Sequence, residues 1–178
     1  MTSPYLVPVA SILRNIPSSV EVSFSAPFDP EHEFPARAVG ESDVDPDVDA
    51  SVTVRLESFS GGIMARGVVS VPWRGLCRRC SADVTGILEV PVTERFVEDG
   101  DPSDEEDYAF SGDSVDLAPL VHDAAFLHLP LAPLCREDCA GLCSICGGDR
   151  NETPCDCQVP RDPRWAMLDA LRSNDQLE

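Results

Sequence analysis

Residues 51–71, "SVTVRLESFSGGIMARGVVSV", alternate apolar and polar side chains on both sides of Gly61-Gly62. Val52, Val54 and Leu56 share one face of a strand with a two-residue repeat, and the run after the glycines can return beside it. Glycines between two such runs are typical of a hairpin turn, because glycine accepts the backbone angles that tight turns require. The stretch predicts an antiparallel β-hairpin at the centre of the fold.

Further strands are predicted on both sides of this hairpin. "SVEVSF" at 19–24 and "TGILEVPVTERF" at 85–96 alternate in the same way. We expect a short helix over 9–15 and surface loops in the acidic segments 38–50 and 97–114. The predicted fold class is α+β, with an antiparallel β-rich core and a few helices.

The segment 115–128 predicts an amphipathic helix, capped by Ser114 or Asp116 and ended by Pro130. A second helix is predicted within 161–178, where the Asp-Pro pair suits a helix start. We therefore expect three parts. They are a β-rich core at 1–130, a cysteine-rich metal module at 131–160, and a C-terminal helix and tail at 161–178.

Charge limits the partners that the chain can have. Acidic residues number 32 against 13 basic ones, all of them arginine, and the net charge of −19 disfavours phosphate backbones and membrane surfaces. No apolar run approaches the roughly 20 residues of a membrane helix, and no export signal is seen at the N-terminus, so we expect a cytoplasmic protein. The stretch 65–80 lacks acidic residues, and its candidate partner-binding residues are Arg66, Trp73, Arg74, Arg78 and Arg79.

Eight cysteines carry the most specific chemical signal. In a reducing compartment, clustered cysteines are more often metal ligands or catalytic thiols than disulfides. "CRRC" and "CSIC" each have the Cys-x-x-Cys spacing that directs two sulfurs at one zinc ion. We predict one or two structural Zn²⁺ ions, with candidate ligands Cys77, Cys80, Cys135, Cys139, Cys143, Cys146, Cys155 and Cys157.

The spacing leaves the pairing of these cysteines open. The preferred partition joins Cys143 and Cys146 with Cys155 and Cys157, and Cys77 and Cys80 with Cys135 and Cys139. One site with spare thiols is the alternative. The Cys139-x-x-x-Cys143-x-x-Cys146 spacing also occurs around radical-enzyme iron–sulfur clusters, but only 32 residues follow it. A redox-active Cys77–Cys80 pair would be expected at a helix start, whereas its sequence context runs from strand to strand.

Taken together, these segments resemble the YceD family of large ribosomal RNA subunit accumulation proteins. The matching pieces are "CRRC" after a strand, the acidic break, "DLAPLVHDAAFLHLPLAPLC", "CAGLCSICGGDRNETPCDC" and "DPRWAMLDAL". The resemblance implies a role in the accumulation of 23S rRNA and in large-subunit assembly, without enzyme activity. Not all family members retain the C-terminal cysteines, so the resemblance does not make the distal metal module essential.

The predicted function is that of a zinc-stabilised, non-enzymatic assembly factor in bacteria. Its acidic surface suits a basic large-subunit ribosomal protein or a pre-ribosomal particle, and the arginine stretch would make limited RNA contacts. No phosphate-binding loop, nucleophile elbow or paired-histidine metal motif is seen. The alternative function is a thiol-disulfide oxidoreductase or a redox sensor that releases zinc.

Overall fold

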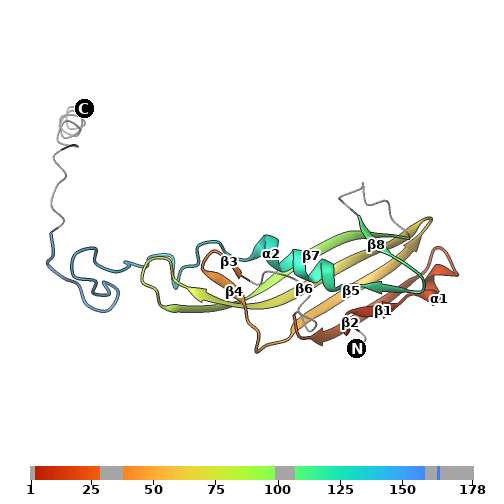
Figure 1. Cartoon of the computed structure of the whole chain (residues 1–178), viewed down its shortest axis with the longest axis horizontal. Helices are drawn as coiled ribbons and strands as arrows, with labels where there is room; N and C mark the ends of the chain where they lie inside the picture. Colours follow the sequence, from red (N-terminus) through yellow and green to blue (C-terminus); the bar gives the residue numbers. More distant parts are fainter. Residues whose placement is uncertain (1–2, 29–37, 99–106, 159–163, 165–178) are drawn as a thin grey trace. The chain divides into compact units, whose positions relative to one another are not determined.

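The predicted hairpin is formed by β5 (Ala50–Phe59) and β6 (Gly62–Leu76), which pair antiparallel across Gly61. β2 (Ser19–Ala26) pairs with the other edge of β5, and β7 (Asp83–Glu98) pairs with β6 along its whole length. These strands lie side by side in Figure 1 and belong to one seven-stranded sheet. The α+β class and the antiparallel β-rich core are therefore confirmed.

The computed structural model describes residues 3–28, 38–98, 107–158 and 164. The chain divides into two compact units, residues 1–135 and 136–178. The first unit contains the strands and helices, and the described part of the second consists of turns and the two-residue bridge Leu142–Asp149. The predicted C-terminal helix lies outside the described residues, except for Arg164.

The acidic segment 38–50 was predicted as a loop, but its first part forms the small hairpin of β3 (Ala38–Val39) and β4 (Ser42–Val44), while residues 45–49 are a loop as predicted. β4 pairs with the Trp73–Gly75 part of β6, beyond the residues of β6 that pair with β5. The buried Ser42 hydroxyl donates to the carbonyl of Pro130 at 2.6 Å. The loop prediction was wrong for residues 38–44. The backbone groups of β6 that do not pair with β5 need hydrogen-bond partners, and this need outweighs the weak strand propensity of the segment.

The acidic loop predicted at 97–114 is also partly structured. Among its described residues, β8 (Tyr108–Phe110) pairs parallel with β7, and β9 (Ser114–Asp116) pairs with β1 (Leu6–Pro8) in a second sheet. Residues 99–106 lie outside the described part of the chain. The chain therefore returns to the sheet edge before α2 begins.

The predicted helix is α2 (Ala118–His128), and a second short helix, α1 (Ala10–Leu13), lies in the predicted N-terminal position. The N-cap of α2 is Leu117, and not Ser114 or Asp116 as predicted; the Asp116 carboxylate, just before the helix, accepts a hydrogen bond from the Ala118 N–H at 2.9 Å. The helices of the described residues are α1 and α2. Neither is long and apolar enough to cross a membrane.

α2 packs on one face of the sheet, against β6 and β7 (Figure 1). The helix contributes a buried apolar stripe that includes Leu120, Val121 and Ala125, which meets the inward side chains of the strands. Leucine and valine side chains such as those of Leu120 and Val121 each contribute roughly 1.5–3 kcal/mol when fully buried. The opposite face of the sheet carries the alternate side chains and includes exposed Val68 and Ile87.

Candidate metal centres

The first candidate centre begins at the turn between β6 and β7. Cys77 donates its N–H to the Ala82 carbonyl at 2.8 Å, and Ser81 donates its N–H to the Cys77 carbonyl at 2.8 Å. Ser81 has a positive φ of 58°, which closes the turn tightly. We call this arrangement the first knuckle (residues 76–83). It directs the Cys77 and Cys80 side chains to one side of the turn, and both are buried.

The segment after α2 brings further sulfurs to this knuckle. The Arg78 N–H donates to the Pro133 carbonyl at 2.9 Å, and the sulfurs of Cys80 and Cys135 lie 3.6 Å apart. All four sulfurs of the first group lie within 4.8 Å of one another, and its members are Cys77, Cys80, Cys135 and Cys139. Cys135 is exposed, and the other three are buried.

Backbone N–H groups stabilise the ionised form of one cysteine in the first group. The Cys135 N–H, followed by those of Arg79 and Cys80, lowers the pKa of the Cys77 thiol to about 6, although burial opposes the shift. A thiol with this pKa is largely ionised at neutral pH, and the thiolate is the form that binds metal. The amides thus favour the charge that a metal ion would neutralise.

The second candidate centre is built on a turn with the same hydrogen bonds. Cys143 donates its N–H to the Gly148 carbonyl at 2.8 Å, and Gly147 donates its N–H to the Cys143 carbonyl at 2.8 Å. Gly147 occupies the position of Ser81 and has a φ of 72°, which glycine adopts without strain. We call this arrangement the second knuckle (residues 142–149).

The two knuckles repeat a sequence motif that spacing of the cysteines alone did not reveal. Residues 76–83 read "LCRRCSAD" and residues 142–149 read "LCSICGGD". The flanking Leu and Asp pair across each turn, Leu76 with Asp83 and Leu142 with Asp149. A search for internal repeats could have found this signal. The shared register indicates that both knuckles present their cysteines in the same way.

The second group combines this knuckle with two later cysteines. Its four sulfurs also lie within 4.8 Å of one another, and its members are Cys143, Cys146, Cys155 and Cys157. N–H groups of Cys146 and Ile145, together with the Cys155 thiol, lower the pKa of Cys143 to about 6. Hydrogen bonds with the sulfurs of Cys146 and Cys155 raise the pKa of Cys157 to about 12. Bringing four ionised sulfurs together here requires a cation.

The residues present fit a metal ion in both groups, because each offers four sulfur donors at one point and no other type of ligand. The sets are the ones that the preferred partition of the cysteines predicted. Cys139 belongs to a different group from Cys143 and Cys146, so these three do not form one iron–sulfur triad. Cys77 and Cys80 lie in a hairpin turn and not at a helix N-terminus.

The predicted partner-binding residues do not form one compact patch. Arg66 and Arg74 share the outer face of β6 but stand about 26 Å apart along it, from the rise of an extended strand. Trp73 points to the opposite face and packs against the core. Arg78 and Arg79 are exposed on the first knuckle. The five predicted residues are therefore spread along β6 and the first knuckle and do not form a single surface.

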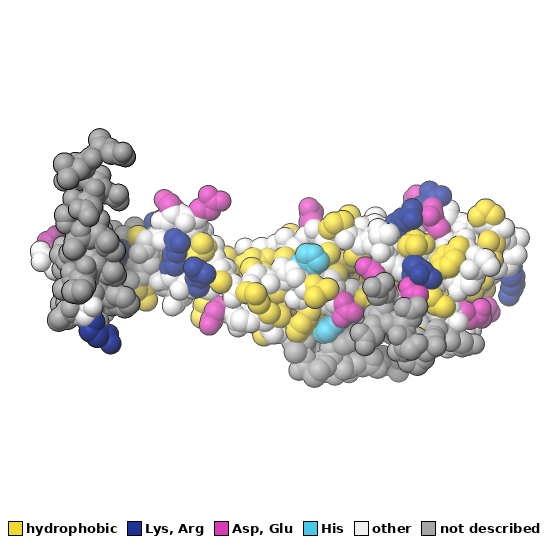
Figure 2. All heavy atoms as spheres, turned by 90° about the horizontal axis from the view of Figure 1, so that it is seen from above, with side chains coloured by type: hydrophobic (Ala, Val, Ile, Leu, Met, Phe, Trp, Pro, Cys, Tyr) yellow, Lys and Arg dark blue, Asp and Glu magenta, His cyan; other side chains and the backbone are white. Residues whose placement is uncertain are grey.

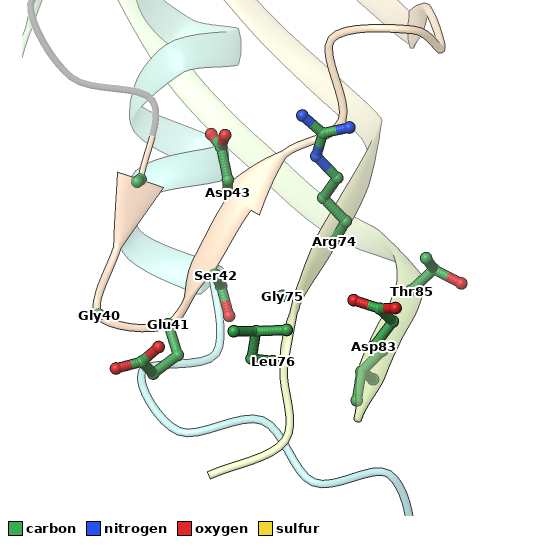
Figure 3. A pocket seen from close by; sticks show the side chains of 11 residues that line it. Gly40, Glu41, Ser42, Asp43, Arg74, Gly75, Leu76, Asp83 and Thr85 are labelled. Atoms are coloured by element: carbon green, nitrogen blue, oxygen red, sulfur yellow. The ribbon is translucent and has the colours of Figure 1, made fainter. Parts of the chain in front are cut away.

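A recess of about 450 Å³ lies beside the first knuckle, at the end of the outer sheet face. Figure 3 shows the carboxylates of Glu41, Asp43 and Asp83 around it, with the Arg74 guanidinium on the same rim. Arg74 lies 3.7 Å from the Asp47 carboxylate. This arginine is therefore partly neutralised where RNA contact was predicted.

A second hollow lies beside α2. It is lined by the carboxylates of Glu94, Asp107 and Asp123, by Arg95, and by apolar side chains that include Leu127, which is 81% exposed. Burial and then the charges of Asp123 and Asp107 raise the pKa of Glu94. Figure 2 shows hydrophobic side chains around the two histidines of the described residues, both of which are on α2.

Comparison with known proteins identifies relatives over most of this region. A family model described as large ribosomal RNA subunit accumulation protein YceD matches residues 65–172. Uncharacterized proteins of Mycobacterium tuberculosis and Mycobacterium bovis are 38% identical over 120 residues, which cover 65% of this chain and 58% of theirs. An uncharacterized Mycobacterium leprae protein is 32% identical over 131 residues, 70% of this chain and 60% of its own. No solved structure matches.

Proposed function

Because the chain belongs to the YceD family, whose description is large ribosomal RNA subunit accumulation protein, we propose that it is a non-enzymatic, cytoplasmic factor for 23S rRNA accumulation and large-subunit assembly. The observation that carries the proposal is the family match over residues 65–172, which span the β6–β7 hairpin, α2 and both knuckles. The chain spans about six tenths of the length of its curated relatives.

Zinc is the metal proposed for both four-sulfur groups. A Zn²⁺ ion takes four thiolates in a closed tetrahedral shell, and such a shell leaves no open position for catalysis. Its ligands would be Cys77, Cys80, Cys135 and Cys139 in the first group and Cys143, Cys146, Cys155 and Cys157 in the second. Bound in this way, zinc would supply folding energy and not reactivity.

A basic large-subunit ribosomal protein, alone or within a pre-ribosomal particle, is the partner that the charge favours. The chain carries −19, and two four-thiolate zinc sites would bring this to about −23. Such a field attracts basic protein segments and repels bare RNA. Direct RNA contact would be confined to the exposed arginines of the predicted stretch, and Trp73 contributes through packing. These arginines are Arg66, Arg74, Arg78 and Arg79.

Affinity capture from a lysate of the native bacterium tests this function. We expect the tagged chain to capture large-subunit proteins and 23S rRNA precursors, and ribonuclease treatment to remove the RNA but to leave a basic protein bound. Depletion of the chain should lower 23S rRNA relative to 16S rRNA. If neither large-subunit proteins nor 23S precursors are captured and depletion leaves the ratio unchanged, the proposed function is wrong.

Arginine variants separate the protein contact from the RNA contact. Arg78→Ala should reduce RNA capture several-fold and leave capture of the basic protein unchanged. Arg55→Ala is the matched control, because Arg55 is exposed on the neighbouring strand but pairs with Glu57 at 2.9 Å. Equal RNA loss in the control would show that the effect follows net charge and not the position of Arg78.

A further inference from the structure

Asn151 connects the two metal-binding groups in a way that the cysteine spacing did not predict. Its side-chain N–H donates to the Cys139 sulfur at 3.4 Å and to the Asp149 carboxylate at 2.7 Å. Its side-chain carbonyl accepts the Ala140 N–H and the Arg136 guanidinium, both at 2.7 Å. Cys139 belongs to the first group, whereas Asp149 belongs to the second knuckle.

These contacts fix the orientation of the amide. Both N–H donors and both carbonyl lone pairs of Asn151 are used. A backbone N–H and a guanidinium can only donate, and a carboxylate can only accept, so rotating the amide by 180° would break all of these contacts. The side chain is held in the position in which its N–H meets the sulfur.

The position of Asn151 depends on the second group. The residue lies between the second knuckle and Cys155, in a loop held by a bond from the Asn151 N–H to Asp149 at 2.8 Å. The Arg150 N–H also donates to the Gly141 carbonyl at 3.0 Å. A metal ion on the second group would close this loop at both ends and restrict it to the conformation that places the amide on Cys139.

We propose that Asn151 is a positioning residue that couples the two metal centres. A metal ion in the second group holds Asn151 against the Cys139 thiolate, and this hydrogen bond increases the metal affinity of the first group. The coupling is reciprocal, because linkage requires that each ion raises the affinity for the other by the same factor. Hydrogen bonds to metal ligands commonly contribute about 10- to 100-fold in metal affinity. The inference rests on the proposed metal binding by both groups.

The two centres differ in access to solvent, which sets the order of release. Three of the four cysteines in the first group are buried, whereas only Cys143 is buried in the second. Chelators and competing thiols reach exposed sulfurs first. The second centre should therefore lose its ion first, and the Asn151 contact should then make the first centre easier to empty.

Cadmium-113 NMR of the full chain tests the coupling, because each four-sulfur site gives its own resonance. The Cys155→Ser/Cys157→Ser variant assigns the signals, and a chelator titration gives the affinity of the first centre with and without its neighbour. We expect the loss of the second ion to weaken the first centre about 10- to 100-fold. In an Asn151→Ala background, the same loss should change the first centre less than about twofold.

Two further variants test whether the Asn151 side-chain N–H itself carries the coupling. Asn151→Asp removes the N–H donor but keeps the size of the side chain, so it should act like Asn151→Ala. Glu152→Ala is the matched control, because its exposed side chain is the next in the loop, and it should keep the full coupling. Near-ultraviolet circular dichroism checks that the sheet around Trp73 stays folded.

The outcomes separate the coupling from the proposed function. If two ions bind but the second-ion effect persists in Asn151→Ala, or is absent from the unmodified chain, the coupling is wrong while metal binding stands. If fewer than two cadmium resonances appear in the unmodified chain, metal binding by both groups is wrong, and the coupling fails with it.

Discussion

Single residues in this protein show where charge and folding oppose each other. Glu94 points from β7 toward α2, where burial and the carboxylates of Asp123 and Asp107 raise its pKa. A carboxyl whose pKa is higher in the folded state contributes stability at low pH and loses it as the pH rises through that folded pKa. At neutral pH the charge on Glu94 therefore opposes folding.

Replacing Glu94 by glutamine should stabilise the protein at neutral pH. Glu94 is only partly buried, so solvent screens much of its charge. We therefore expect a gain below about 1 kcal/mol in the free energy of unfolding at pH 7. The gain should vanish below about pH 4, where the carboxyl is protonated in both states. Urea denaturation at the two pH values measures it. Glu89→Gln, on the opposite face of β7, is the control, and an equal gain there would refute the local explanation.

At the scale of elements, the close contact between β6 and β7 determines the position of the Trp73 side chain. Gly86 lies opposite Trp73 in the β6–β7 register, and a Cβ at Gly86 would lie 2.7 Å from the indole nitrogen. The glycine thus makes room for the ring to cover the strand. This close approach lets Trp73, a predicted partner-binding residue, pack against the core.

Gly86→Val should disturb this packing. Overpacking at such a contact costs about 1–3 kcal/mol, because the indole must leave its position. We expect a lower urea midpoint and a change in tryptophan fluorescence. Thr85→Val, at the adjacent exposed position, should change the midpoint by less than about 0.5 kcal/mol. A Gly86→Val protein as stable as the control would contradict the observed contact.

At the scale of the whole molecule, a metal ion on the first group would link segments that lie far apart in the sequence. Cys80 and Cys135 are 55 positions apart, and one ion on the first group would hold the two ends of this loop together in the folded chain. Closing a loop of that length by a covalent link is worth about 4 kcal/mol in chain entropy. The first group is therefore expected to stabilise the sheet and α2 together.

Removal of metal should weaken the fold by a similar amount. Chelation is expected to lower the free energy of unfolding by up to about 4 kcal/mol, measured by urea denaturation followed by tryptophan fluorescence. Cys135→Ser should cause much of the same loss, and chelator should then add little. An unfolding transition that does not respond to chelator in the unmodified chain would show that the first group holds no structural ion.

The sequence by itself determined the central hairpin, α2 and the set of cysteines that could bind metal, because these depend on local periodicity and side-chain chemistry. Tertiary structure decided the rest. It turned residues 38–44 into strands that complete β6, placed Trp73 and Arg74 on opposite faces, and chose one partition of the cysteines. It also set Asn151 against Cys139. Each of these features depends on which distant segments pair, and pairing follows from backbone hydrogen bonds and packing that spacing along the chain does not specify.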